Sequence, residues 1–123
     1  MNVSLYGSGA KDQCKVQLKE ARPYLVVEYE GQPITTQLIG GYNFENVAVA
    51  IAIGQHFGIP VSEMKAALEG YQPSNNRSQV IRTASRTLVM DAYNANPSSM
   101  KAAIKNFFEL EAAEKWMILG DML

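Results

Sequence analysis

Residues 87–97 read TLVMDAYNANP and combine an apolar run, a polar loop and a proline. The run Thr87–Met90 is short and rich in β-branched and apolar side chains, which predicts a strand that ends at Asp91. Pro97 suits the first turn of a helix, because the N–H group that proline lacks would have no partner there. The stretch therefore predicts a strand, a loop and a helix, the opening of a βαβ unit in an α/β fold.

The residues after Pro97 continue this pattern. Apolar side chains recur at helical spacing at Met100, Ala103, Ile104, Phe107 and Leu110. The apolar run Trp116–Leu119 predicts a second strand, parallel to the first, because a helical crossover joins parallel strands. A parallel sheet of two strands leaves its faces uncovered, so the pattern indicates a piece of a longer protein.

Upstream of residue 72, the sequence has two textures. Residues 1–39 alternate apolar and polar side chains, which predicts an antiparallel sheet with a turn at Glu30–Pro33. From residue 40 onward the period becomes helical. We expect one helix from an N-cap at Asn43 to a stop at Gly58, and a second helix from Ser62 to Gly70.

The polar, turn-rich stretch Gln72–Asn76 is the expected linker between two domains. The first domain, residues 1–76, would hold the strands and two helices. The second, residues 77–123, would hold the incomplete βαβ unit.

The composition excludes several classes of protein. Eleven Lys and Arg against twelve Asp and Glu argue against a nucleic-acid-binding protein. One cysteine, Cys14, and one histidine, His56, do not make a Cys/His metal site. The longest apolar run is far shorter than the roughly 18 residues of a membrane span. The cysteine usage and the lack of signal-peptide character in the first residues predict a cytoplasmic protein.

Two groups of polar residues are candidates for ligand binding. Asn43 and Asn46 are spaced to be neighbours on a helix, and two carboxamides offer donors and acceptors for the edge of an adenine. N-capping alone is the alternative role of Asn43. Asp91 and the polar residues after it follow a strand and precede a helix, where α/β sheets bind ligands. The Asp91 carboxylate suits a ribose diol, with capping of the next turn as the alternative.

The sequence contains no G-x-x-x-x-G-K-[ST] phosphate loop and no G-x-G-x-x-G or H-E-x-x-H motif. It does contain, in order, GGYNFENVAVA at 40–50, Arg77, DAYNANPSSMKAA at 91–103 and LGDM at 119–122. This set resembles the Mur ligases closely over residues 40–123. The D-x-Y-N-A-N-P-x-S-M form resembles the branch of that family that adds D-alanyl-D-alanine.

The resemblance implies a three-domain enzyme, in which residues 1–76 end the central ATP-binding domain and residues 77–123 begin a Rossmann-like C-terminal domain. It implies that ATP phosphorylates the terminal carboxylate of UDP-N-acetylmuramoyl-tripeptide, a peptidoglycan precursor. The amine of D-alanyl-D-alanine then attacks the acyl-phosphate. ATP and Mg²⁺ are the implied cofactors, and the lysine of the phosphate loop and the metal ligands fall outside this chain.

The same resemblance implies roles for seven residues. Four would contact the nucleotide: Asn43 and Asn46 beside the adenine, Asp91 at the ribose hydroxyls, and Arg77 from between the two domains. Three would line the cleft for nucleotide and incoming amine: Tyr93, Asn94 and Asn96. No catalytic residue or metal ligand is implied here. Tyr42 departs from the family pattern, which usually has histidine at that position.

Two other hypotheses stay open. One is a fragment of a ligase similar to folylpolyglutamate synthase, which the run Tyr93–Asn96 disfavours. The other is a non-catalytic nucleotide-binding or scaffolding module. Because the phosphate loop is absent from these residues, we expect the chain by itself to have no ligase activity.

Overall fold

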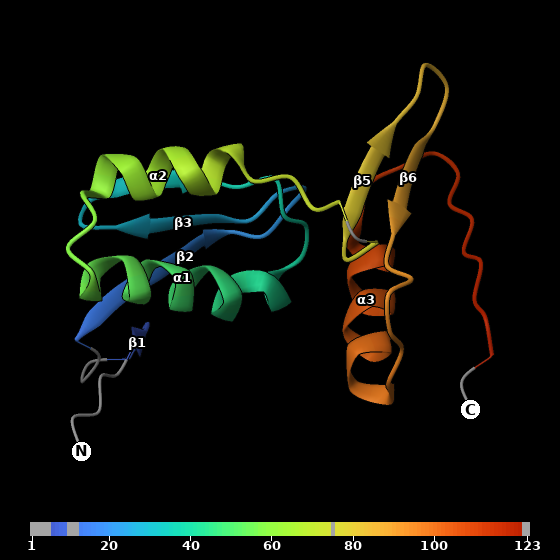
Figure 1. Ribbon diagram of the computed structural model, residues 1–123. Helices are drawn as coiled ribbons and strands as arrows, with labels where there is room; N and C mark the ends of the chain where they lie inside the picture. Colours follow the sequence, from blue (N-terminus) through green and yellow to red (C-terminus); the bar gives the residue numbers. More distant parts are fainter. Residues whose placement is uncertain (1–5, 10–12, 75, 122–123) are drawn as a thin grey trace. The chain divides into compact units, whose positions relative to one another are not determined.

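The computed structural model describes residues 6–9, 13–74 and 76–121 (Figure 1). Asn75, in the expected linker, and Met122, in the LGDM motif, lie outside the described residues. The chain divides into two units, Met1–Pro73 (unit 1) and Ser74–Leu123 (unit 2), and the division falls within the stretch expected to be a linker. Each unit is described by itself.

Unit 1 contains a four-stranded sheet in the order β1-β2-β3-β4. Its strands are β1 (Tyr6–Gly7), β2 (Cys14–Glu20), β3 (Val26–Tyr29) and β4 (Gln32–Thr35). The pairs β2–β3 and β3–β4 are antiparallel, as the alternation of side chains predicts, and β1 pairs with β2 in parallel.

The hairpin between β3 and β4 turns on only two residues, Glu30 and Gly31, because Tyr29 already pairs with Gln32. Both turn residues have positive φ, 49° and 73°, and this geometry matches the twist of the flanking strands. Pro33, expected in the turn, lies inside β4. Proline is tolerated there because β4 is an edge strand, and the backbone groups on its outer side need no hydrogen bond to another strand.

Two helices cover one face of this sheet (Figure 1): α1 (Phe44–His56), preceded by the short η1 (Gly41–Asn43), and α2 (Val61–Gly70). Their positions confirm the two helices expected from the sequence. Alternate residues of the strands point at the helices and form the core with them. The core consists of Cys14, Val16, Leu25, Val27, Tyr29, Ile34, Val47, Ala48, Ile51 and Met64.

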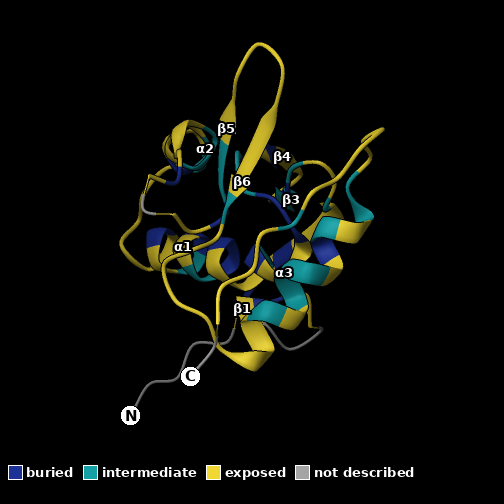
Figure 2. Cartoon of the chain, turned by 90° about the vertical axis from the view of Figure 1, so that its right-hand side faces the viewer, coloured by how far each residue is buried: buried dark blue, intermediate teal, exposed yellow. Residues whose placement is uncertain are grey.

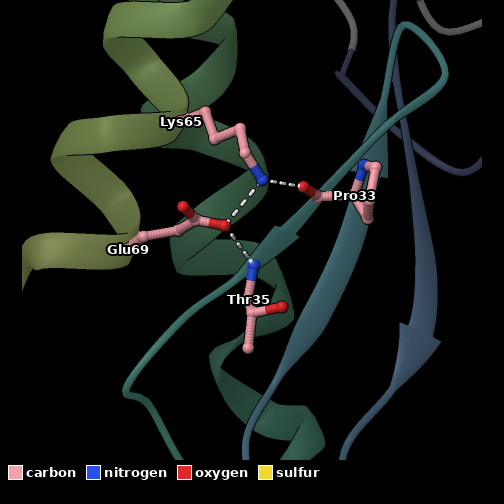
Figure 3. A network of polar contacts seen from close by, with 4 residues as sticks. All are labelled: Pro33, Thr35, Lys65 and Glu69. Atoms are coloured by element: carbon pink, nitrogen blue, oxygen red, sulfur yellow. Dashed lines mark hydrogen bonds and ion pairs between the residues drawn. The ribbon is translucent and has the colours of Figure 1, made fainter.

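A polar network fixes α2 against the edge strand (Figure 3). Lys65 Nζ donates to the carbonyl oxygen of Pro33 and, at 2.7 Å, to Glu69 Oε1. The same carboxylate oxygen accepts the N–H of Thr35 at 3.1 Å. In β4, residues that hydrogen-bond to β3 alternate with residues whose backbone groups point the other way. Pro33 and Thr35 are of the second kind, so their backbone groups point outward from the edge of the sheet. The helix thus satisfies groups that would otherwise be open to a further strand.

Unit 2 contains a hairpin and a helix. β5 (Gln79–Arg82) and β6 (Thr87–Met90) are antiparallel, and α3 (Pro97–Glu109) follows β6. The strand and the helix expected from residues 87–97 are confirmed. The hairpin is exposed over most of its length (Figure 2), and the apolar stripe expected on α3 is only half-buried.

The second parallel strand expected at Trp116–Leu119 is wrong for this structure. These residues form no regular element, and within the described part of unit 2 the only sheet is the antiparallel pair β5–β6. A strand needs a hydrogen-bonded neighbour and a buried face. Trp116 and Ile118 have neither, since they are 85% and 98% exposed. The expected βαβ unit is therefore present only as its first strand and helix.

Candidate functional site

The first candidate group, Asn43 and Asn46, lies where η1 passes into α1. Asn43 is buried and uses both ends of its carboxamide. Its Nδ2 donates to the carbonyl oxygen of Ile39 at 2.8 Å, and its Oδ1 accepts from Asn46 Nδ2 at 3.1 Å. The structure therefore brings the two asparagines together, and the buried residue orients the exposed one.

Asn43 occupies the N-cap position of α1, as expected, but its side chain makes no capping hydrogen bond. The reason is its backbone conformation: φ of −81° and ψ of −4° are helical, whereas an N-cap side chain normally reaches its N–H partner from an extended backbone. The preceding η1 turn imposes this conformation. The Asn43 carboxamide is thereby left to bond Ile39 and Asn46.

The second group lies in unit 2, in the loop that leaves β6. Asp91 Oδ1 accepts the backbone N–H of Ser78 at 3.2 Å. The Arg77 guanidinium lies over the ring of Tyr93, with its Cζ 3.9 Å from the ring centroid. Three residues expected at the site, Arg77, Asp91 and Tyr93, are thus gathered within one unit.

Ser78 was missed by sequence reasoning. It is buried, and its contact with Asp91 is made through the backbone N–H, a group that every residue except proline carries. No residue type in the sequence could have signalled this bond. The stretch Gln72–Asn76 was expected only to be a linker, and Ser78 lies just after it.

Asn96 has a structural role in the loop before α3. It is the N-cap of this helix: its Oδ1 accepts the N–H of Ser99 at 2.9 Å and the hydroxyl of Ser98 at 2.7 Å. Ser99 Oγ accepts the N–H of Asn96 in return, which completes a capping box. Asn94, expected beside it in the cleft, is exposed in the same loop.

Comparisons with known proteins show which family this chain resembles. Residues 76–123 match the family model described as "Mur ligase, glutamate ligase domain". The UDP-N-acetylmuramoyl-tripeptide–D-alanyl-D-alanine ligase of Treponema pallidum is 34% identical over 98% of this chain. The ligase of the same name from Bacillus subtilis is 33% identical over 96%. The chain belongs to the Mur ligase family.

This Mur ligase chain spans about a quarter of the length of those relatives, 26% and 27%. A solved structure of MurF from Acinetobacter baumannii matches 84% of the chain and 24% of its own length, with a TM-score of 0.69 and 23% identity. A second structure from that organism, of UDP-N-acetylmuramoylalanyl-D-glutamyl-2,6-diaminopimelate–D-alanyl-D-alanyl ligase, gives a TM-score of 0.72 at 23% identity. These structures support the α/β fold.

Two features are absent from the described residues of this chain. No group of three or more His, Cys, Asp or Glu side chains among them could hold a metal ion. Nor does any described helix have the length and apolar character that crossing a bilayer requires. The candidate residues of unit 1 offer two carboxamides. Those of unit 2 offer a carboxylate, a guanidinium and a phenol ring.

Proposed function

We propose that the chain is part of an ATP-dependent ligase of peptidoglycan precursor synthesis. The whole protein would join D-alanyl-D-alanine to UDP-N-acetylmuramoyl-tripeptide through an acyl-phosphate. The observation that supports this most is the Asp91–Asn96 loop, because it follows β6, precedes α3 and, together with Pro97, carries the D-x-Y-N-A-N-P pattern. Two relatives more than 30% identical over nearly the whole chain carry the name of that activity.

In this proposal, unit 1 is the end of the central ATP-binding domain and unit 2 is the start of a Rossmann-like domain. Asn46, oriented by Asn43, would face the adenine, because an exposed carboxamide both donates and accepts hydrogen bonds. Asp91 would accept hydrogen bonds from the ribose hydroxyls. Arg77 would bring positive charge toward the nucleotide, and Tyr93 and Asn94 would lie near the nucleotide and the incoming amine.

The contribution of this chain to the reaction would be binding and orientation. When ATP is bound, it supplies the phosphoryl group that activates the carboxylate. Holding the nucleotide and the amine in a reactive arrangement lowers the entropic part of the barrier. Mg²⁺ would be held by residues elsewhere in the ligase, as the resemblance to the Mur ligases implies. The ligase would act in the cytoplasm, where its precursors are made.

The test is product formation by the longer protein that contains this chain. It would be incubated with ATP, Mg²⁺ and UDP-N-acetylmuramoyl-tripeptide, and with D-alanyl-D-alanine, L-alanine or L-glutamate as the amine. Mass spectrometry should show extension of the precursor by D-alanyl-D-alanine alone. Extension by L-glutamate or L-alanine instead would overturn the proposed substrate.

A further inference from the structure

In unit 2, each residue of the turn 76–78 contacts one residue of the loop 91–93. The carbonyl oxygen of Asn76 accepts the N–H of Ala92 at 2.8 Å. The guanidinium of Arg77 lies over the ring of Tyr93. The N–H of Ser78 bonds the carboxylate of Asp91. Every residue of the turn 76–78 therefore has a partner in the loop 91–93.

We infer that this turn is a positioning element for the candidate ligand-binding loop. Ser78 fixes the Asp91 carboxylate, and Arg77 fixes the plane of the Tyr93 ring. The inference rests on the proposed function, in which Asp91 and Tyr93 meet the ligands. It gives Arg77 a role that acts through Tyr93, besides any contact of its own with the nucleotide.

The loop needs such support because it has little of its own. Asp91, Ala92 and Tyr93 are exposed and lie outside β6 and α3. At its far end, the Asn96 capping box fixes the loop to α3. At its near end, the contacts with the turn are what restrict the two side chains. A carboxylate held before the ligand arrives loses less conformational entropy on binding.

The backbone of the turn indicates that its shape is imposed. Asn76 and Ser78 have φ of 57° and 50°, in the left-handed region that residues other than glycine rarely adopt. Asparagine tolerates this region better than serine. Such conformations persist where surrounding contacts over-determine them, and they cluster at functional sites. The strained Ser78 is also the residue whose N–H reaches Asp91, so the strain and the contact coincide.

A ligand-free measurement tests the positioning directly. Nitrogen-15 relaxation of the 123-residue chain should show the amides of residues 91–93 as ordered in the wild type. In Arg77→Ala they should become more mobile, and the ring signals of Tyr93 should move toward free-tyrosine values. Arg86→Ala is the matched control, because it removes an exposed arginine from the β5–β6 turn. Unchanged mobility in Arg77→Ala would overturn the inference.

Titration of the longer protein with adenosine and with ATP distinguishes a positioning role of Arg77 from a contact between Arg77 and phosphate. Adenosine carries no phosphate, so a residue that only contacts phosphate leaves its affinity unchanged. We expect Arg77→Ala to weaken adenosine and ATP alike, by about two- to fivefold, as loss of a cation–π contact allows. Arg77→Lys should not restore affinity fully, because lysine lacks the planar group. Weakening of ATP alone, with full rescue by lysine, would contradict the positioning role.

The proposed function fails in a different way. If the longer protein binds neither adenosine nor ATP, or if its Asp91→Ala variant binds both as the wild type does, the proposed nucleotide site is wrong. The relaxation data then still decide whether the turn orders the loop.

Discussion

Asn43 and Asn46 look alike in the sequence and differ in the structure. Asn43 is buried and bonds Ile39 and Asn46, whereas Asn46 is exposed. Asn43→Ala should lower the free energy of unfolding of unit 1 by about 1–3 kcal/mol, because it leaves the buried Ile39 carbonyl oxygen without its donor. Asn46→Ala should cost less than about 1 kcal/mol.

The measurement is urea unfolding of the chain, followed by the amide signals of unit 1. Equal losses in the two variants would contradict the orienting role given to Asn43. The difference also decides which variant is useful in an assay. Asn46→Ala should remove an exposed carboxamide while keeping the fold, so its effect on nucleotide use can be read directly.

For single residues, the sequence predicted contacts between near neighbours in the chain better than contacts between distant residues. The spacing of Asn43 and Asn46 correctly indicated neighbours, since i and i+3 face each other on a helix. The Ser78 contact could not be predicted, because it uses a backbone N–H across 13 residues. The capping box of Asn96 and Ser99 could have been predicted from the sequence, but only a role in the cleft was predicted for Asn96.

Among the elements, α2 is held to β4 by hydrogen bonds from Lys65 to the Pro33 carbonyl oxygen and from the Thr35 N–H to the Glu69 carboxylate, and this carboxylate titrates. The hydrogen bond from Lys65, followed by the N–H of Thr35, lowers the pKa of Glu69 below its ordinary value. A carboxylate with a lowered pKa contributes stability that is complete above its unfolded pKa and is lost as the pH falls through its folded pKa. The docking of α2 should therefore weaken below about pH 4.3, the ordinary pKa of glutamate.

Urea unfolding of the wild type and Glu69→Gln between neutral and acidic pH checks this. The wild type should be more stable at pH 7, by a modest amount because the pair is partly exposed, and the two should converge as the pH falls. Glu63→Gln, on the same helix and exposed, is the control. A difference between wild type and Glu69→Gln that stays constant with pH would rule out the titrating contact.

Gly54 lies in the middle of α1, where alanine would normally favour the helix by about 1 kcal/mol. Here an added Cβ would lie 2.3 Å from the Sδ and 3.0 Å from the Cγ of Met64 on α2. Gly54→Ala should therefore force the buried Met64 out of its place and destabilise unit 1 by about 1–2 kcal/mol, since overpacking exceeds the propensity gain.

A double-mutant cycle provides the control. In a Met64→Ala background the same change should become neutral or stabilising, because the clash is gone. If Gly54→Ala destabilises equally in both backgrounds, close packing of α1 on α2 is not the cause.

The helices could be predicted from the sequence because their periodicity and stop residues are local signals. The strands β2, β3 and β4 followed from the alternation of apolar and polar side chains, whereas β1 and its parallel pairing did not. β5 was missed because Gln79–Arg82 is short and its partner lies across a turn rather than across a helix. The strand predicted at Trp116–Leu119 was wrong, because an apolar run becomes a strand only when a neighbouring strand shares hydrogen bonds with it.

For the whole molecule, the chain by itself should not act as a ligase. Its sequence contains no phosphate loop, and its described residues no metal cluster, so nothing in them would place the γ-phosphate. Incubated with ATP, Mg²⁺ and UDP-N-acetylmuramoyl-tripeptide, the 123-residue chain should form no acyl-phosphate, measured by hydroxylamine trapping. Trapped product above background would show that the chain activates the carboxylate itself.

Phosphate release by the longer protein tests the central claim most directly. With ATP, Mg²⁺ and UDP-N-acetylmuramoyl-tripeptide present, release should depend on D-alanyl-D-alanine. Asp91→Ala and Asn46→Ala should raise the KM for ATP, while Arg86→Ala leaves it unchanged. Release that is indifferent to D-alanyl-D-alanine, from a folded protein, would contradict the proposal that this chain belongs to a D-alanyl-D-alanine-adding ligase.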